Sequence, residues 1–244
     1  MASDAPVMPE TLPRLVPAML SFVAGYVDSC TFLALFGLYV AQLTGSFVLV
    51  GTETVIHDAG AAIKLLAIPV FGLAGAVTTV LVRKSRGRAV LPATLALEAA
   101  LLVGLFVSWR LGAPLTARGD PAVLLASLCG LSAMGVQSAL VRLLVKGCPS
   151  TNVMTTNTTL FAIDATDLVI TWRAHRRALG DAAVAAAYRQ VRDRFALLCP
   201  IVLGFVVGTI GGAAAYARLD LWCVLIAVGV VIALAAWASR RTSA

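Results

Sequence analysis

Six long apolar runs constrain this chain more than any other feature of its sequence. Each holds about 20 residues, enough for a helix that crosses a bilayer at 1.5 Å per residue. Of the 244 residues, 60% are hydrophobic and 13% are charged, whereas about a quarter of a soluble domain is charged. A soluble globular protein is therefore excluded, and an all-α membrane protein is predicted. The six runs cover residues 15–37, 62–82, 89–110, 122–145, 195–217 and 220–238.

Two further apolar pieces do not fit a simple crossing. Residues 42–57 are too short to cross, and residues 151–170 carry many Thr and Asn side chains. Both pieces are interpreted as re-entrant half-helices, which enter the membrane and leave it on the same side. The alternative is that both pieces cross.

The basic residues favour the re-entrant topology. With a cytoplasmic N-terminus it places 15 of the 19 Lys and Arg residues inside, whereas the alternative places 12 inside. Because cytoplasmic loops are enriched in Lys and Arg, both termini are predicted to be cytoplasmic. The basic insertion at residues 173–194 is expected to form a short helix on the cytoplasmic surface. The net charge of +7 thus sets topology, and no nucleic-acid partner is predicted.

An internal duplication divides the chain. A shift of 111 residues lays Thr44 over Thr155, and nine residues further along it lays Glu53 over Asp164. Because each copy has three crossings, the second copy is inverted in the membrane relative to the first, as in transporters with broken helices. Chance alignment of Ala- and Gly-rich helices is the alternative. The predicted parts are a disordered tail at residues 1–14, a first repeat at 15–110 and a second repeat at 122–238.

One segment also carries a family resemblance. Residues 24–51, AGYVDSCTFLALFGLYVAQLTGSFVLVG, contain a Gly-x-x-Asp group followed by Thr-Gly and a polar residue. This segment resembles the signature region of the YoaK-like family of bacterial integral membrane proteins. The resemblance implies about six spans of bilayer length. It also implies a place in the bacterial cytoplasmic (inner) membrane, and it implies no particular substrate.

Two acidic residues lie near the centres of apolar runs, Asp28 in the first and Glu98 in the third, with no Lys or Arg at the same depth. An unpaired carboxylate in hydrocarbon costs several kcal/mol, so each acid must be protonated, hydrated or bound to a cation. Both are predicted to carry coupling protons. The alternative is a protonated acid that only hydrogen-bonds a neighbouring helix. Gln137 in the fourth run is expected to be the neutral partner of Asp28.

The starts of the two half-helices are predicted to bind substrate. Free backbone N–H groups and the positive end of the helix dipole lie there and attract anions or polar atoms. The Ser, Thr and Asn side chains at these positions could instead act only as helix caps. The predicted substrate-binding residues are Thr44, Gly45, Ser46, Gln137, Thr155, Thr156 and Asn157.

Other residues suggest gating and close packing. Glu53 and Asp164 lie toward the far ends of the half-helices and are interpreted as gating charges or as surface anchors. Gly204, Gly208 and Gly212 recur at every fourth position. This spacing is typical of close helix packing, either within the monomer or in a homodimer.

No enzyme activity, metal or cofactor is predicted. The chain lacks a P-loop, an H-E-x-x-H pair and the later-span histidine that a membrane serine protease needs. Deep unpaired acids and broken helices favour a proton-coupled secondary transporter for a small polar or anionic solute. A channel and a membrane scaffold without flux are the competing functions. The expected partners are the solute and the lipid bilayer, with a second copy of the chain as an alternative.

Overall fold

The computed structural model describes residues 15–55, 61–85, 89–113, 120–145, 148–178 and 180–243, and every regular element in these ranges is helical. The predicted tail, residues 1–14, lies outside the described part. The helices are α1 (Leu15–Ala34), α2 (Leu43–Val55), α3 (Ala61–Lys84), α4 (Val90–Gly112), α5 (Pro121–Leu144), α6 (Met154–Arg177), α7 (Ala182–Leu219), η1 (Asp220–Cys223) and α8 (Val224–Ser243).

Each predicted apolar run lies in a helix. Four runs correspond to α1, α3, α4 and α5, the fifth is the second half of α7, and the sixth spans η1 and α8. These helices, with α7 and α8 taken as one continuous stretch, are long and apolar enough to cross a membrane. The 13 residues of α2 are too few, and the 24 residues of α6 are too polar. The prediction of an all-helical protein with several membrane-length apolar helices is confirmed.

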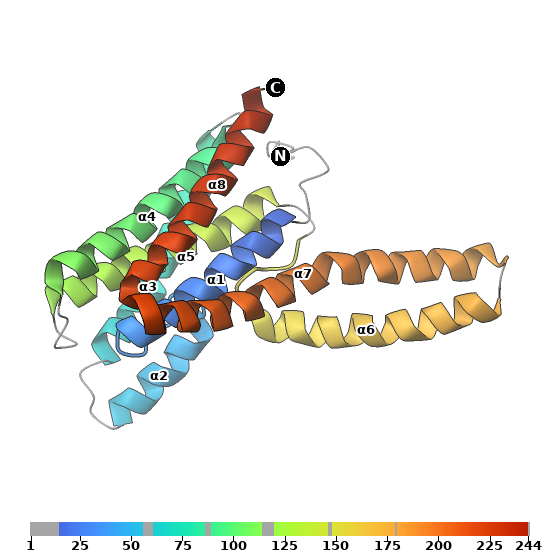
Figure 1. Cartoon of the computed structure of the whole chain (residues 1–244), viewed down its shortest axis with the longest axis horizontal. Helices are drawn as coiled ribbons and strands as arrows, with labels where there is room; N and C mark the ends of the chain where they lie inside the picture. The colour runs from blue at the N-terminus through green and yellow to red at the C-terminus, as the bar shows by residue number, and fades with distance from the viewer. Residues whose placement is uncertain are drawn as a thin grey trace.

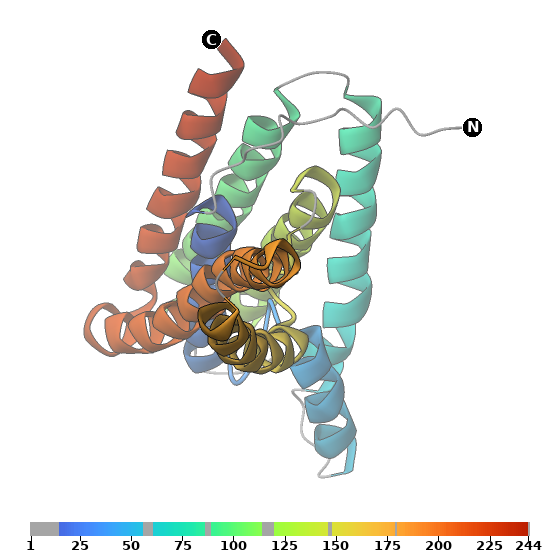
Figure 2. The ribbon, with the colours of Figure 1, turned by 90° about the vertical axis from the view of Figure 1, so that its right-hand side faces the viewer.

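The long helices form a bundle from which one hairpin departs. α1, α3, α4, α5 and α8 make the bundle together with the second half of α7, which packs along α1 (Figure 1). α6 and the first half of α7 lie side by side and leave the bundle together. Seen along this hairpin, α8 and α3 lie on either side of it, and α2 lies beside one end of α3 (Figure 2).

The tip of this hairpin is the basic insertion, so the expectation of a separate surface helix over residues 173–194 is wrong. The first residues of the insertion end α6, and the last ones begin α7. Asp181 caps α7, because its Oδ1 accepts from Ala183 N at 2.8 Å and from Val184 N at 3.3 Å. The alanine-rich sequence that follows favours helix, so α7 continues into the apolar run without a break.

Aromatic pairs join the two arms of the hairpin. The ring centroids of Phe161 and Phe195 are 5.2 Å apart, and those of His175 and Tyr188 are 5.4 Å apart with the rings stacked. α6 ends at Arg177, beyond the end expected for a half-helix over residues 151–170.

Glycines allow α7 to pack directly on the backbone of α1. A Cβ atom on Gly204, Gly208 or Gly212 would lie 2.5, 2.2 or 2.5 Å from a carbonyl oxygen of α1. Only glycine fits at such distances. The predicted close packing is confirmed, and this contact lies within the monomer.

Two further glycines join the two halves of the chain, α1–α4 and α5–α8, in matching ways. A Cβ atom on Gly25 of α1 would lie 2.5 Å from Phe205 O in α7. A Cβ atom on Gly135 of α5 would lie 2.7 Å from Phe71 O in α3. The first helix of each half thus packs on the third helix of the other half.

Candidate functional site

Two segments without regular secondary structure lead into α2 and α6. They are residues 35–42 before α2 and residues 148–153 before α6. The first is held by Asp28, which is buried in α1. Oδ1 of Asp28 accepts hydrogen bonds from Val40 N at 2.8 Å and from Ala41 N at 2.7 Å. The carboxyl group therefore fixes the chain that leads into α2.

The second segment is held by Gln137, which is buried in α5. Its Nε2 donates to Leu20 O at 2.9 Å, to Thr151 Oγ1 at 3.3 Å and to Asn152 Oδ1 at 3.4 Å. Ser21 Oγ of α1 also approaches Thr151 O, at 3.3 Å. Gln137 thus joins α1, α5 and the chain that leads into α6.

Gln137 is not the partner of Asp28, contrary to the prediction. Its amide bonds Leu20 O, and Leu20 is eight residues from Asp28 along α1, roughly 12 Å at 1.5 Å per residue. The two side chains are instead counterparts. Each binds the irregular segment that follows its own helix, 12 to 15 residues further along the chain.

Apart from Gln137, which lies in α5, the predicted substrate-binding residues lie at the starts of α2 and α6. Ser46 and Asn157, the fourth residues of these helices, are buried. Ser46 Oγ donates to Tyr39 O at 3.2 Å, and Asn157 Nδ2 donates to Ser150 O at 2.6 Å, in both cases seven residues upstream. Each bond folds a helix start back onto its irregular segment. The remaining predicted residues, Thr44, Gly45, Thr155 and Thr156, are exposed or partly exposed.

The buried faces of α2 and α6 are polar. Ser46 and Glu53 are the only buried residues of α2, and Asn157 and Asp164 are the only buried residues of α6. The members of each pair are seven residues apart, about two helical turns, so they lie on one face. These faces turn toward the protein and carry the predicted binding and gating residues.

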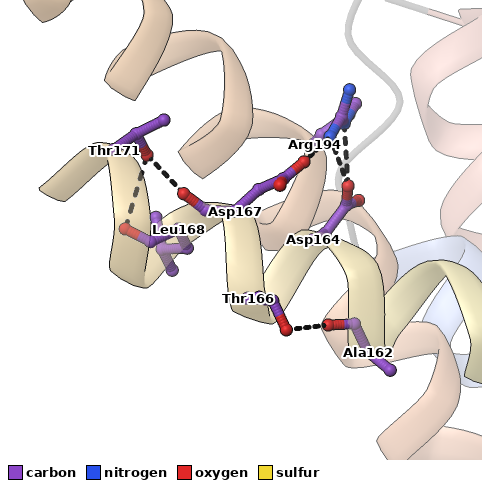
Figure 3. Close-up of polar contacts among 7 residues, drawn as sticks. All are labelled: Ala162, Asp164, Thr166, Asp167, Leu168, Thr171 and Arg194. Carbon is purple, nitrogen blue, oxygen red and sulfur yellow. Dashed lines mark hydrogen bonds and ion pairs between the residues drawn. The ribbon is translucent and has the colours of Figure 1, made fainter.

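Each predicted gating acid forms an ion pair with a base on the third helix of its own half. Glu53 pairs with Lys64 of α3, and both side chains are buried. Asp164 pairs with Arg194 of α7, whose Nη2 and Nε lie 2.5 and 2.9 Å from Oδ1 (Figure 3). Arg194 also lies 3.5 Å from Oδ2 of Asp167, and its side chain is 52% exposed. Both predicted gating acids are buried.

Glu98 lies at the centre of the inward face of α4. It is fully buried, and neither of its carboxyl oxygens has a hydrogen-bond partner in the part of the chain that the structure describes. Leu95 and Leu102 lie one turn away on the same face. A charged carboxylate there would have no compensating hydrogen bond or ion pair among the described residues.

A cavity of about 530 Å³ opens beside the start of α6. It collects two of the predicted substrate-binding residues, Thr156 and Asn157, and adds Arg142 from the end of α5. Across the described ranges, no cluster of His, Cys, Asp and Glu side chains could hold a metal ion. The cavity is lined by Ser138, Val141, Arg142, Cys148, Pro149, Ser150, Val153, Thr156, Asn157 and Leu160.

Comparison with known families places the chain. A family model described as "Protein of unknown function (DUF1275)" matches residues 16–237. The chain belongs to this family. The match agrees with the YoaK-like resemblance of residues 24–51 and includes every site residue described above. No curated protein and no solved structure matches the chain.

Lys64 and Arg194, like Arg142 in the cavity, are site residues of this DUF1275 protein that the sequence does not predict. From the sequence, all three are expected only as charges that set topology. A weak signal exists, because Lys64 lies five residues before Pro69 and Arg194 six residues before Pro200. Both prolines lie inside the third helix of their half.

Proposed function

We propose that this DUF1275 protein is a secondary transporter that moves a small polar or anionic solute by alternating access with proton coupling. Its six crossing helices form two inverted repeats. α2 and α6 are re-entrant half-helices whose starts face the solute. The main support for the proposal is that corresponding contacts recur at matched positions in both halves of the chain.

Three contacts recur at matched positions. They join the first helix of one half to the third helix of the other, the first helix to the irregular segment, and the second helix to the third. Chance similarity between apolar helices does not reproduce buried polar contacts, so their recurrence supports the inverted repeat. The matched sets are Gly25–Phe205 with Gly135–Phe71, Asp28–Val40/Ala41 with Gln137–Thr151/Asn152, and Glu53–Lys64 with Asp164–Arg194.

The two ion pairs differ in the way that alternating access requires. The Glu53–Lys64 pair is sealed from solvent, whereas Arg194 is half exposed in its pair with Asp164. In the topology with a cytoplasmic N-terminus, the sealed pair lies on the outer side and the exposed pair on the cytoplasmic side. This difference supports an inward-facing state, with the cavity beside α6 on the open side.

Flux through purified protein in liposomes tests the function. Solutes that stabilise the protein in a thermal screen of organic anions, amines, sugars and amino acids are taken forward, with empty liposomes as the control. A transporter gives saturable uptake and counterflow, a channel gives flux that does not saturate, and a scaffold gives no flux. Lack of counterflow for every solute that binds would overturn the proposal.

Cysteine labelling checks the topology. In a background without the partly exposed Cys129, Cys148 and Cys199, we expect Ser85→Cys and Ala183→Cys both to react from the cytoplasmic side only. With a cytoplasmic N-terminus, Ser85 is cytoplasmic only if the first piece does not cross, and Ala183 shares its side only if the second piece does not cross. Labelling of both positions from the outside would show that the first piece crosses, and labelling from opposite sides would show that the second piece crosses.

Neutral replacement of the two deep acids checks proton coupling. Asn at position 28 keeps an oxygen acceptor for Val40 N and Ala41 N, so Asp28→Asn should fold, and Glu98→Gln keeps the shape of the protonated acid. We expect both variants to retain solute exchange and to lose the roughly tenfold accumulation that one pH unit drives for one proton per solute. Asp28→Ala, which lacks the acceptor, is the structural control and should lose folded protein. An acid whose neutral variant still accumulates solute is structural.

A further inference from the structure

We infer that the cavity beside α6 binds the anionic group of a small organic anion, held between Arg142 and the first turn of α6. This inference rests on the proposed transport function and names its substrate class. It adds Arg142, a residue that topology alone would explain, to the solute site.

Among the lining residues that the structure describes, the cavity carries positive charge only. Arg142 is the one charged side chain in this set, which includes no Asp or Glu. Arg142 forms no ion pair with any carboxylate among the residues that the structure describes. A guanidinium group presents several N–H donors in a planar arrangement that suits carboxylate and phosphate. At about 530 Å³ the cavity has the size of a small-molecule site.

The start of α6 adds unused donors to the same cavity. The residue at the cap position is Val153, which has no side-chain acceptor, and Asn157 uses its amide on Ser150 O instead. The first backbone N–H of the helix that reaches a carbonyl is that of Asn157, which donates to Val153 O at 3.3 Å. The N–H groups of residues 154–156 therefore keep their donors free, at the positive end of a 24-residue helix.

α4 also lacks a side-chain cap, at Ala89, but three other helix starts use their donors differently. Asp120 caps α5, and Asp181 caps α7, each through its side-chain carboxylate. In α2, the counterpart of α6, both Gly45 N and Ser46 N already donate to Gln42 O. Free donors beside a cavity that holds an unpaired arginine thus occur at α6, and an anion would satisfy both.

The remaining lining of the cavity suits the apolar part of an organic anion. Arg142 has no cationic counterpart in the first half of the chain. Val141, Val153 and Leu160 supply apolar surface. If Gln137 matches Asp28 and Gly135 matches Gly25, the position that corresponds to Arg142 is Leu33 or Phe32. The first half offers no cation there, so the anionic end of the solute lies against the second half.

Binding to the purified full-length protein in detergent tests the inference. The probes are butyrate, succinate and butyl phosphate, with butanol and butylamine as neutral and cationic controls of similar size. We expect the anions, and not the two controls, to raise the melting temperature in a saturable way. Arg142→Gln should weaken this binding at least tenfold and Arg142→Lys should weaken it less. Arg83→Gln, which removes an exposed arginine at the end of α3, should leave it unchanged.

The outcomes separate this inference from the transport function. If none of the three anions binds, or if Arg142→Gln binds them as the wild type does, the inference is wrong even if another solute is transported. If the anions bind through Arg142 but show no counterflow, the inference stands and the transport function fails. A lipid headgroup is the other source of an anion. Stabilisation by phosphatidylglycerol nanodiscs over phosphatidylcholine nanodiscs that depends on Arg142, without binding of the free anions, would assign the cavity to lipid and overturn the solute site.

Discussion

Gly208→Ala is expected to disrupt the packing of α7 on α1 and to lower the melting temperature of the protein strongly. The new Cβ would lie 2.2 Å from Phe22 O and 2.9 Å from the carbonyl carbon of Phe22. Backbone atoms cannot move aside as a flexible side chain can, so the cost should lie at about 3 kcal/mol, the upper end for overpacking. In a chain of this size that corresponds to a fall of about 6–12 °C in Tm.

A neighbouring glycine on the same helix provides the matched control. A Cβ on Gly211 would have Tyr26 Cδ2 as its nearest neighbour at 3.9 Å, an ordinary contact. Gly211→Ala makes the same chemical change with the same gain in helix propensity, and we expect its Tm to stay within a few degrees of the wild type. Thermal unfolding followed by tryptophan fluorescence in detergent measures both variants. Equal Tm values for the two would mean that α7 does not pack on α1 as described.

Glu53→Gln should destabilise the protein far more than Asp164→Asn, although the two acids occupy matched positions. Without Glu53, the buried ammonium group of Lys64 loses its carboxylate, and breaking a buried pair in this way costs about 3–5 kcal/mol. Without Asp164, the half-exposed Arg194 is solvated, so the cost should be about 1 kcal/mol or less. The expected fall in Tm is about 6–20 °C for Glu53→Gln and about 4 °C or less for Asp164→Asn.

A double variant shows whether the charge is the cause. Glu53→Gln with Lys64→Gln leaves a neutral pair at the same place, and we expect it to recover most of the stability that Glu53→Gln loses. If the double variant is as unstable as the single one, the loss reflects packing rather than an uncompensated charge. If Asp164→Asn is the more damaging change, the difference in solvent access between the two ion pairs is not real.

The helices of this protein are predictable because hydropathy acts locally. A run of about 20 apolar residues has only one stable backbone arrangement in a membrane, so α1, α3, α4 and α5 follow from composition alone. The starts of α2 and α6 are predictable for a similar reason, because Thr and Asn concentrate at Thr44, Thr155 and Asn157 between apolar stretches. The predicted duplication assigns the acids Glu53 and Asp164 to matched places.

Long-range pairing is not predictable in the same way. Matched positions in two predicted repeats indicate equivalence, and equivalent residues such as Gln137 and Asp28 do not have to touch. The bases Lys64 and Arg194 lie 11 and 30 residues from their acids, so no single helical spacing relates them. The charge of residues 173–194 does not predict the length of α7, because charge does not interrupt a helix that is capped and rich in alanine.

The helices that pack against α1 are among the last parts of the chain to be synthesised. Ser21 Oγ bonds Ile201 O, and the Tyr26 hydroxyl bonds Cys223 O, across 180 and 197 residues of chain. At about 5–20 residues per second, α1 waits roughly 10–40 s in the membrane before α7 has been synthesised. During this time the glycine and hydroxyl face of α1 lacks its helical neighbour. Residues 15–110, the predicted first repeat, therefore do not complete their packing while they are being synthesised, and the fold is complete only when the last helices of the chain close on the first.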